Sequence, residues 1–288
     1  MKKVYTGVMM LALSLIITAC GSQTASGPSF SQNAQGTPKG GERVELTVFA
    51  AASMTETLEE ISGLYAEAAP NVKLTFNFDS SGTLKTQIQE GAECDLFISA
   101  GQRQVDQLDI AVSDAVNTER LDFIATETRV NLLENRVTLV VPSGNPKSIG
   151  SFSDMADALT GGLILMAMGN SDVPVGQYTQ QILEHFELDE GAIAASGLIS
   201  YGSNVKEVTT QVSEASVDFG VVYCTDAFSA GLDIAAYATV DMCGRVIYPA
   251  AVIETSKNKG AAGAFLDYLT SAEAARVFEN VGFSVVKR

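Results

Sequence analysis

The feature that most constrains this chain is a turn in which an apolar strand runs into very small residues and then directly into a helix. Its first copy follows residues 44–50, where apolar and polar side chains alternate as in a strand that enters a buried sheet. Ser53 follows, and Glu56 stands three residues later, which is the spacing of a capping box. This stretch alone favours an ordinary capped helix start. If Ser53 turns outward instead, its hydroxyl and the free N–H groups of the helix start suit a small oxyanion.

The same design recurs at four later strand ends, and the recurrence predicts both a fold and a site. Alternating strands and helices predict a mainly parallel sheet with helices on both faces. Ligands of such sheets bind beyond the carboxyl ends of the strands. The five ends offer hydroxyls or first-turn amides, namely those of Ser53, Ser80 or Ser81, Val175, Val205 and Tyr223. Neutral dipoles of this kind can hold a dianion in a low-dielectric site without a paired cation.

Residues around these turns sharpen the prediction. Pro174 fits the first position of a helix, where its missing N–H costs nothing, and this leaves Val175 as the first donor. Asn204 and Glu207 repeat the capping-box spacing. Lys206 is the basic residue at these tips, and we expect it on a solvated face. The remaining pattern predicts helices over about 55–69, 152–159 and 261–280, and strands over 72–78, 94–99, 136–141, 163–168, 197–201, 217–223 and 245–252.

Residues 1–19 have the features of an export signal followed by a lipid-attachment site. Met1-Lys2-Lys3 precedes an apolar run that is too short to span a membrane. Ile17-Thr18-Ala19-Cys20 resembles the lipobox of bacterial lipoproteins, and an ordinary signal with a chance cysteine is the alternative. Acylation of Cys20 would anchor the chain stably to a membrane surface. The composition of residues 20–43 predicts a flexible tether. Because of the lipid anchor, we expect the protein on the outer face of the cell membrane or on its periplasmic side.

The acidic balance of the chain bears on its partners. Removal of a signal that carries Lys2 and Lys3 leaves 16 basic residues against 34 acidic ones, a net charge of −18. This charge argues against nucleic acid as a partner. An acidic shell also repels anions at long range, so an anion site must act through short-range donors.

Cysteine and histidine usage does not indicate a metal site. With Cys20 assigned to lipid, Cys94, Cys224 and Cys243 remain, an odd number for an exported chain. A Cys224–Cys243 disulfide is an open alternative to three free thiols. No Cys/His spacing indicates zinc, and the single histidine, His185, falls within a predicted helix on its solvated side.

Enzyme signatures are weak. A Ser-His-Asp triad lacks a base, and no G-x-S-x-G, Walker A loop or G-x-G-x-x-G follows a strand. Ser203 and Lys206 match S-x-x-K, but the partner motifs Lys-Thr-Gly and Ser-Asp-Asn are missing. Asp95 is a candidate catalytic carboxylate, although capping of neighbouring backbone is favoured. A hydrolase or transferase therefore stays a distant alternative to a binding protein, and no cofactor is expected.

Six motifs along residues 44–288 resemble those of the molybdate-binding proteins of bacterial ABC importers. They are Val48-Phe-Ala-Ala-Ala-Ser53, Phe78-Asp-Ser-Ser-Gly-Thr-Leu84, Asp95-Leu-Phe-Ile-Ser-Ala100, Val173-Pro-Val-Gly176, Gly220-Val-Val-Tyr223 and Tyr248-Pro-Ala-Ala251. The resemblance implies an α/β, two-lobed periplasmic-binding-protein-like fold, with each lobe a mainly parallel sheet flanked by helices. The lobes would comprise 44–135 plus 248–288, and 136–247, with hinge crossings near 135–137 and 246–249.

The resemblance also implies how the site is built, and its donors are those that the strand ends predict. The first lobe would supply the hydroxyls of Ser53 and Ser81, and the second lobe the N–H groups of Val175 and Val205 and the phenolic O–H of Tyr223.

Three residues depart from the usual pattern of the family. Asp79 and Gly82 stand where small or hydroxyl residues are usual, and Asp79 would have to point away from an anion. Val175 stands where a smaller residue is common, which leaves the choice among oxyanions open.

The function that the resemblance implies is capture of molybdate, and of tungstate, by a membrane-tethered lipoprotein. The oxyanion would be a ligand and not a cofactor, its metal would have no direct protein ligand, and the protein would deliver it to the membrane permease of an ABC importer. Binding of another tetrahedral oxyanion, such as sulfate or phosphate, is the alternative.

Overall fold

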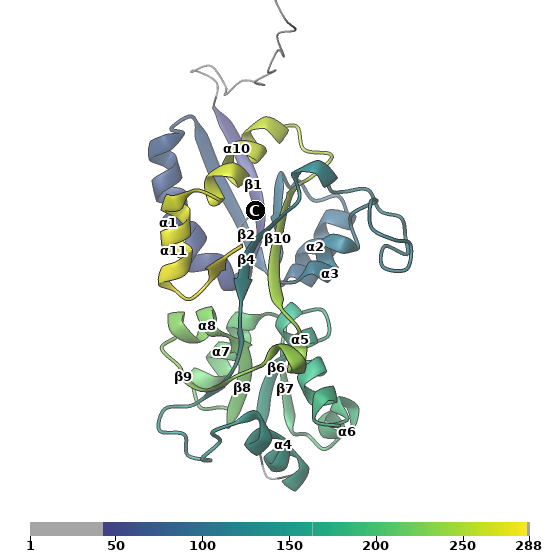
Figure 1. Cartoon of the computed structure of the whole chain (residues 1–288), viewed down its shortest axis with the longest axis vertical. Helices are drawn as coiled ribbons and strands as arrows, with labels where there is room; N and C mark the ends of the chain where they lie inside the picture. Colours follow the sequence, from purple (N-terminus) through teal and green to yellow (C-terminus); the bar gives the residue numbers. More distant parts are fainter. Residues whose placement is uncertain (1–42, 163, 287–288) are drawn as a thin grey trace, which may run out of the picture. The chain divides into compact units, whose positions relative to one another are not determined.

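The computed structural model describes residues 43–162 and 164–286. The predicted signal, the predicted lipid site at Cys20 and the tether up to residue 42 lie outside these residues. Those that are described belong to one compact unit, which contains two β-sheets with helices around each (Figure 1). We call each sheet with its helices a lobe. Within the described part of the chain, no helix has both the length and the apolar character needed to cross a membrane.

The first lobe contains a six-stranded sheet in the order β11-β4-β10-β3-β1-β2. Its strands are β1 (Val44–Ala51), β2 (Val72–Asp79), β3 (Leu96–Ile98), β4 (Val130–Asn135), β10 (Val246–Val252) and β11 (Ser284–Val285). Its helices are η1 (Ala52–Met54), α1 (Thr55–Ala68), α2 (Ser81–Gln89), α3 (Gln102–Asp106), η2 (Thr126–Thr128), α10 (Lys259–Leu269) and α11 (Ala272–Asn280). The pairings give β1, β2, β3 and β4 one direction and β10 and β11 the other.

The second lobe contains a five-stranded sheet in the order β7-β6-β8-β5-β9. Its strands are β5 (Val137–Val141), β6 (Met166–Gly169), β7 (Ile199–Gly202), β8 (Phe219–Tyr223) and β9 (Asp233–Tyr237). Its helices are α4 (Phe152–Gly161), α5 (Pro174–His185), α6 (Glu190–Ala195), α7 (Val205–Ser213), α8 (Cys224–Ser229) and α9 (Val240–Cys243). Only β5 runs against the other strands described in this sheet. The two-lobed α/β fold expected from the sequence is therefore confirmed.

Alternation along β1 explains why the first sheet is covered on both faces. Leu46 and Val48 belong to the core cluster that contains residues of α1, α10 and α11. Phe49 points the other way, into the cluster formed with α2 and α3. Successive strand residues face opposite sides of a sheet, so two helix layers bury the whole strand. This burial fixes the register of β1, and with it the place where Ser53 leaves the sheet.

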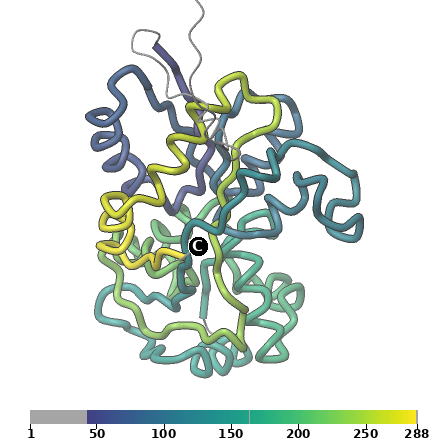
Figure 2. Tube along the Cα trace, turned by 45° about the horizontal axis from the view of Figure 1, so that its top comes forward, coloured from purple at the N-terminus to yellow at the C-terminus, as the bar shows by residue number. Residues whose placement is uncertain are grey.

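The chain passes between the lobes at two neighbouring points. β4 ends at Asn135 in the first sheet and β5 begins at Val137 in the second. The return passage ends where β10 begins at Val246, which pairs with Asn135. Figure 2 shows the two passages side by side. Val246 and Ile247, which the sequence analysis assigned to the second lobe, are thus paired within the first sheet.

Several elements differ from the sequence-based predictions for identifiable reasons. The predicted helix over 261–280 is two helices, because Ser271 caps α11 by accepting the N–H of Ala274. The short strands β9 and β11 lie at sheet edges and are partly exposed, so their apolar pattern is weak. β4 lacks regular alternation and was not predicted. None of these differences moves the strand ends that carry the candidate donors.

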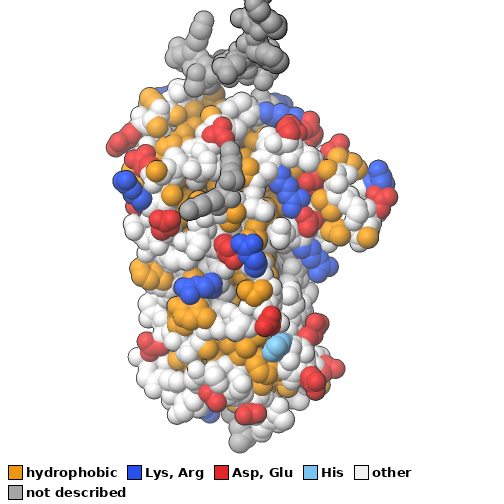
Figure 3. Space-filling view, viewed as in Figure 1, with side chains coloured by type: hydrophobic (Ala, Val, Ile, Leu, Met, Phe, Trp, Pro, Cys, Tyr) orange, Lys and Arg blue, Asp and Glu red, His pale blue; other side chains and the backbone are white. Residues whose placement is uncertain are grey.

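Charged side chains are mixed on the face of the molecule drawn in Figure 3, and lysine and arginine do not gather into one patch there. The three described cysteines, Cys94, Cys224 and Cys243, are buried and free, so the Cys224–Cys243 disulfide is not formed. Burial raises the pKa of Cys94 to about 12 and that of Cys243 to about 11. Both thiols are therefore protonated and poorly nucleophilic at neutral pH.

We predict that thiol titration of a Cys20→Ser form detects three free thiols after denaturation. In the native protein Cys94 and Cys243 should react only slowly, because the thiolate is the reactive form and burial suppresses it. Detection of a single thiol in the denatured, unreduced protein would contradict the structure.

Candidate anion-binding site

The five predicted donors surround one small cavity, to which both lobes contribute. It measures about 10 Å³, room for about one water molecule. A tetrahedral oxyanion is larger, so the walls must move apart to admit one. The first lobe lines the cavity with Ala51, Ala52, Ser53, Asp79, Ser80, Ser81 and Ala100, and the second with Val173, Pro174, Val175, Val205 and Tyr223.

Ser53 does not form the predicted capping box. It lies in η1, and α1 begins two residues later with Met54 as an N-cap that makes no side-chain hydrogen bond. The Ser53 hydroxyl instead lies 2.9 Å from the phenolic oxygen of Tyr248, 195 residues away in β10. Glu56, the expected capping partner, binds Lys206 of the second lobe. The Ser53 hydroxyl therefore turns to Tyr248 of β10 and not to the first-turn N–H groups of α1.

Ser80 and Ser81 make different hydrogen bonds, and only Ser80 caps a helix. Ser80 is the N-cap of α2, and its hydroxyl accepts the N–H of Thr83 at 3.1 Å. Ser81 is fully buried, and its hydroxyl oxygen accepts the N–H of Ala100 at 2.9 Å. Because that oxygen already accepts a bond, the proton of Ser81 is available for an acceptor in the cavity.

Val175 and Val205 contribute backbone donors, because each stands in the first turn of a helix. First-turn N–H groups have no carbonyl partner within their own helix. Pro174 occupies the start of α5, as predicted, and the N-cap Val173 makes no side-chain bond. The Asn204 side chain caps α7 at the N–H of Glu207, 3.1 Å away, and not at Val205. Both helices therefore begin beside the cavity with N–H groups that have no partner within their own helix.

Tyr223 ends β8 and reaches across to the first lobe. Its hydroxyl donates to the carbonyl oxygen of Ala100 at 3.3 Å. Burial raises the pKa of Tyr223 well above its usual value, so the phenol remains a donor at neutral pH. A bound anion would have to replace Ala100 as the acceptor.

Two glycines permit the close approach of backbone around the cavity. A Cβ atom at Gly82, in the first turn of α2, would lie 2.1 Å from the carbonyl oxygen of Asp172 in the second lobe. A Cβ atom at Gly176 would lie 2.3 Å from the carbonyl oxygens of Gly169 and Asn170. Both distances are far below van der Waals contact. Gly82 thus accounts for one departure from the family pattern, because it lets the lobes meet.

Asp79, which the resemblance requires to point away from an anion, is one of the residues that line the cavity. One of its oxygens accepts the N–H of Ser80 at 2.7 Å. This bond holds the carboxylate at the turn before α2.

Lys206 is not a solvated residue, as the sequence analysis expected, but an ion-pair partner between the lobes. Its ammonium lies 2.7 and 2.8 Å from the two carboxylate oxygens of Glu56. It also lies 3.8 Å from Asp226, which is 1% exposed. Neither oxygen of Asp226 has a well-oriented hydrogen-bond partner. Burial raises the pKa of Asp226 to about 7, and nearby Lys206 only partly opposes that effect.

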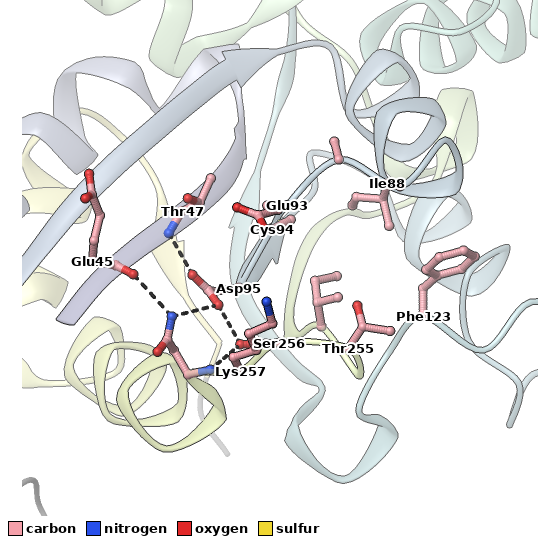
Figure 4. Close-up of a pocket in the computed structure, with 14 residues that line it drawn as sticks. Glu45, Thr47, Ile88, Glu93, Cys94, Asp95, Phe123, Thr255, Ser256 and Lys257 are labelled. Atoms are coloured by element: carbon pink, nitrogen blue, oxygen red, sulfur yellow. Dashed lines mark hydrogen bonds between the residues drawn. The ribbon is translucent and has the colours of Figure 1, made fainter.

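A larger cavity in the first lobe, of about 430 Å³, surrounds Asp95 (Figure 4). The two Asp95 oxygens accept the N–H of Thr47 at 2.9 Å and the hydroxyl of Ser256 at 2.6 Å. Asp95 thus accepts hydrogen bonds from two neighbouring segments, in line with the capping role that the sequence favoured over a catalytic one.

Another depression, of about 630 Å³, is lined by acidic side chains that disfavour an anion: Glu184, Glu187, Asp189 and Glu190. The size of a cavity alone does not identify the site, because the five candidate donor residues line the smallest of these three cavities.

Tyr248 and Asn135 were missed by the sequence analysis as contributors to this site. Tyr248 belongs to one of the six recognised motifs, but no role was assigned to it. Its contact with Ser53 joins positions 195 residues apart, which local spacing does not reveal. Within the described part of the chain, no group of three or more His, Cys, Asp or Glu residues is arranged to hold a metal ion.

Comparisons with known proteins identify a family. The model of a family described as bacterial extracellular solute-binding protein matches residues 46–284. YvgL of Bacillus subtilis, named as a candidate ABC transporter substrate-binding lipoprotein, is 32% identical, covering 98% of this chain and 98% of YvgL. The molybdate-binding protein ModA of Escherichia coli is 32% identical over 84% of this chain and 89% of ModA. The substrate-binding domain of a candidate molybdenum ABC transporter from Clostridium difficile superposes with a TM-score of 0.60 at 31% identity, covering 85% of this chain and all of that domain.

We predict that Asp226 makes the stability of the protein depend on pH. Its pKa is about 7 in the folded protein, against a usual 3.8, so the folded form holds a proton that the unfolded chain releases between these values. Its stabilising contribution is therefore present below about pH 4 and is lost as the pH rises towards 7. The Asp226→Asn variant lacks this titration. The free energy of unfolding of the variant minus that of the parent should increase by on the order of a few kcal/mol as the pH rises from 4 to 8.

Urea denaturation of parent and variant at a series of pH values measures this difference. Asp218→Asn offers a control, because Asp218 is half-buried and donors surround it. A difference between parent and Asp226→Asn that does not change with pH would contradict this prediction, because it would show that Asp226 has the same pKa in the folded and unfolded states.

Proposed function

We propose that this chain, which belongs to the bacterial extracellular solute-binding proteins, captures molybdate between its lobes and delivers it to an ABC importer. The observation that carries the proposal is the cavity itself, which is lined by residues from five separated strand ends. The described relatives support the choice of ligand, because ModA of Escherichia coli is a molybdate-binding protein.

The lining suits a fully deprotonated oxyanion. Ser53 and Ser81 supply hydroxyls from one side, and Val175, Val205 and Tyr223 supply N–H and O–H groups from the other. No lysine or arginine is among the described lining residues. The nearest candidate, Lys206, is occupied by Glu56. Fixed neutral dipoles in a water-excluded cavity then supply the favourable electrostatics.

Closure of the lobes would complete this shell. Each lobe alone offers only part of the donor set, so the anion gains all of its hydrogen bonds only when the lobes meet. A ligand that binds one state better shifts the population towards that state. We therefore propose that molybdate stabilises a closed form and that the permease recognises this form.

Size would separate molybdate from smaller anions. Any tetrahedral oxyanion can accept these hydrogen bonds, but a smaller one cannot touch donors on opposite walls at once. We propose that tungstate, which has the same shape and charge, binds as well, and that sulfate binds less tightly. Unsatisfied buried donors would account for the loss.

Transport would require the protein to stay near the membrane. We propose that residues 1–19 direct export and that Cys20 carries the lipid anchor, with residues 20–43 as a tether. With Val246 and Ile247 paired in the first sheet, the lobes would consist of residues 44–135 plus 246–288, and of residues 136–245. They would move about the two passages near Asn135 and Val246. The comparison with YvgL supports a lipoprotein, because its name describes one.

Hydrogen phosphate is the second candidate ligand, and Asp79 is the observation that favours it. A protonated oxyanion needs an acceptor, and Asp79, one of the lining residues, would supply one by turning its carboxylate from the Ser80 N–H to the cavity. We propose a binding and not a catalytic role in either case. The single histidine, His185, lies in the last turn of α5, away from the lining residues.

We predict that calorimetric titration detects tight binding of molybdate and tungstate, and weaker binding of sulfate and phosphate. The experiment separates the two candidate ligands, because a preference for phosphate would assign Asp79 the role of acceptor. Equal weak binding of all four anions would exclude the molybdate proposal.

We also predict that Ser81→Ala and Tyr223→Phe each weaken molybdate binding by about 1–3 kcal/mol, because each leaves an oxygen of the buried anion without a donor. Thr138→Val is the matched control. Thr138 is fully buried and its hydroxyl donates to the Val222 carbonyl, outside the lining. If both site variants bind as well as this control, the anion binds elsewhere.

A further inference from the structure

We propose that Asn135 and Tyr248 are positioning residues, which fix the direction of the Ser53 hydroxyl so that its proton faces the cavity. The inference rests on the proposed function and concerns how the same site is kept ready for an anion. The three side chains form a continuous chain of hydrogen bonds. Asn135 Nδ2 lies 3.1 Å from Tyr248 Oη, which lies 2.9 Å from Ser53 Oγ.

The first step is the orientation of the Asn135 amide. Its Oδ1 accepts the backbone N–H of Arg136 at 2.8 Å and the thiol of Cys224 at 3.2 Å. A backbone N–H can only donate, so the atom facing it must be the amide oxygen. The amide nitrogen therefore faces Tyr248 and the hydroxyl of Thr225, 3.0 Å away.

The second step is the direction of the Tyr248 hydroxyl. Because Asn135 donates to Tyr248 Oη, the phenolic proton needs another acceptor, and Ser53 Oγ is the other partner at hydrogen-bond distance. Tyr248 is fully buried, so a proton without a partner there would cost free energy. Burial also raises the pKa of Tyr248 well above its usual value, which keeps the phenol protonated. Tyr248 therefore donates to Ser53.

The third step concerns Ser53 itself. Its oxygen accepts from Tyr248, so its own proton is free to point to the cavity that it lines. Ser81 reaches the same state by another route, because its oxygen accepts the backbone N–H of Ala100. Both serines thus present donors. At Ser81 the backbone sets the direction, whereas at Ser53 two side chains set it.

The place of this relay links the site to the passages between the lobes. Asn135 ends β4 and pairs with Val246, and Tyr248 lies two residues farther along β10. Asn135 also contacts the second lobe through Thr225 and Cys224 of α8. The direction in which the Ser53 hydroxyl donates its proton is therefore set by residues of β4 and β10, the strands about which the lobes would move.

A double-mutant cycle on the full-length protein, with molybdate as the probe, tests the relay. Tyr248→Phe removes the donor to Ser53 and lets that hydroxyl turn, so the dissociation constant should rise about three- to tenfold. In a Ser53→Ala background, the same Tyr248→Phe change should alter it less than about twofold, because the residue acts through Ser53. Tyr65→Phe, at a buried tyrosine of α1, is the matched control.

A merely structural role for Tyr248 gives a different result. Tyr248→Phe would then lower the affinity equally in both backgrounds, or leave it unchanged in the parent, and either outcome overturns the inference. Failure of the parent to bind molybdate would instead remove the proposed function on which it rests. Neutron diffraction from the parent needs no variant: the Tyr248 deuteron should lie on the line to Ser53 Oγ, and a Ser53 deuteron directed at Tyr248 would overturn the relay.

Discussion

A buried dianion must find a hydrogen-bond donor for each of its oxygens, because water no longer supplies them. In the proposed function, the architecture of this chain would meet that requirement with groups that folding leaves unused. The N–H groups at the starts of α5 and α7 have no partners within their helices, and Pro174 and Asn204 begin these helices without occupying the donors beside them. Parallel strands bring such helix starts to one edge of each sheet. The site therefore follows from the placement of strand ends and not from a cluster of charges.

Contacts between the lobes act on the same small region. Lys206 pairs with Glu56, each a few residues from a candidate donor. Tyr223 donates to Ala100, whose N–H in turn orients Ser81. Gly82 lets the carbonyl of Asp172 approach where a side chain would prevent it. The arrangement of the lobes and the direction of the donors are thus coupled, because the residues that hold one also determine the other.

Local sequence patterns predicted a mainly parallel sheet between helices and the five candidate donor residues beside the cavity, because strand alternation and helix starts are properties of short segments. The division into two lobes was expected from the family resemblance. The local patterns did not predict the partner of Ser53. The Ser53–Glu56 spacing indicated a capping box. Ser53 instead hydrogen-bonds to Tyr248, and Glu56 pairs with Lys206, and both partners are remote in sequence. Such outcomes depend on tertiary contacts that spacing does not encode. The edge strand β9 was missed because its burial, and hence its apolar pattern, is weak.

The most direct test of this account is a crystal structure with molybdate, in which the anomalous scattering of molybdenum locates the ion. The account predicts a single site in the cavity between the lobes. The hydroxyls of Ser53, Ser81 and Tyr223 and the N–H groups of Val175 and Val205 should lie about 2.7–3.1 Å from the oxygens of the anion. Molybdenum located outside this cavity, or held there by a lysine or arginine side chain, would contradict it.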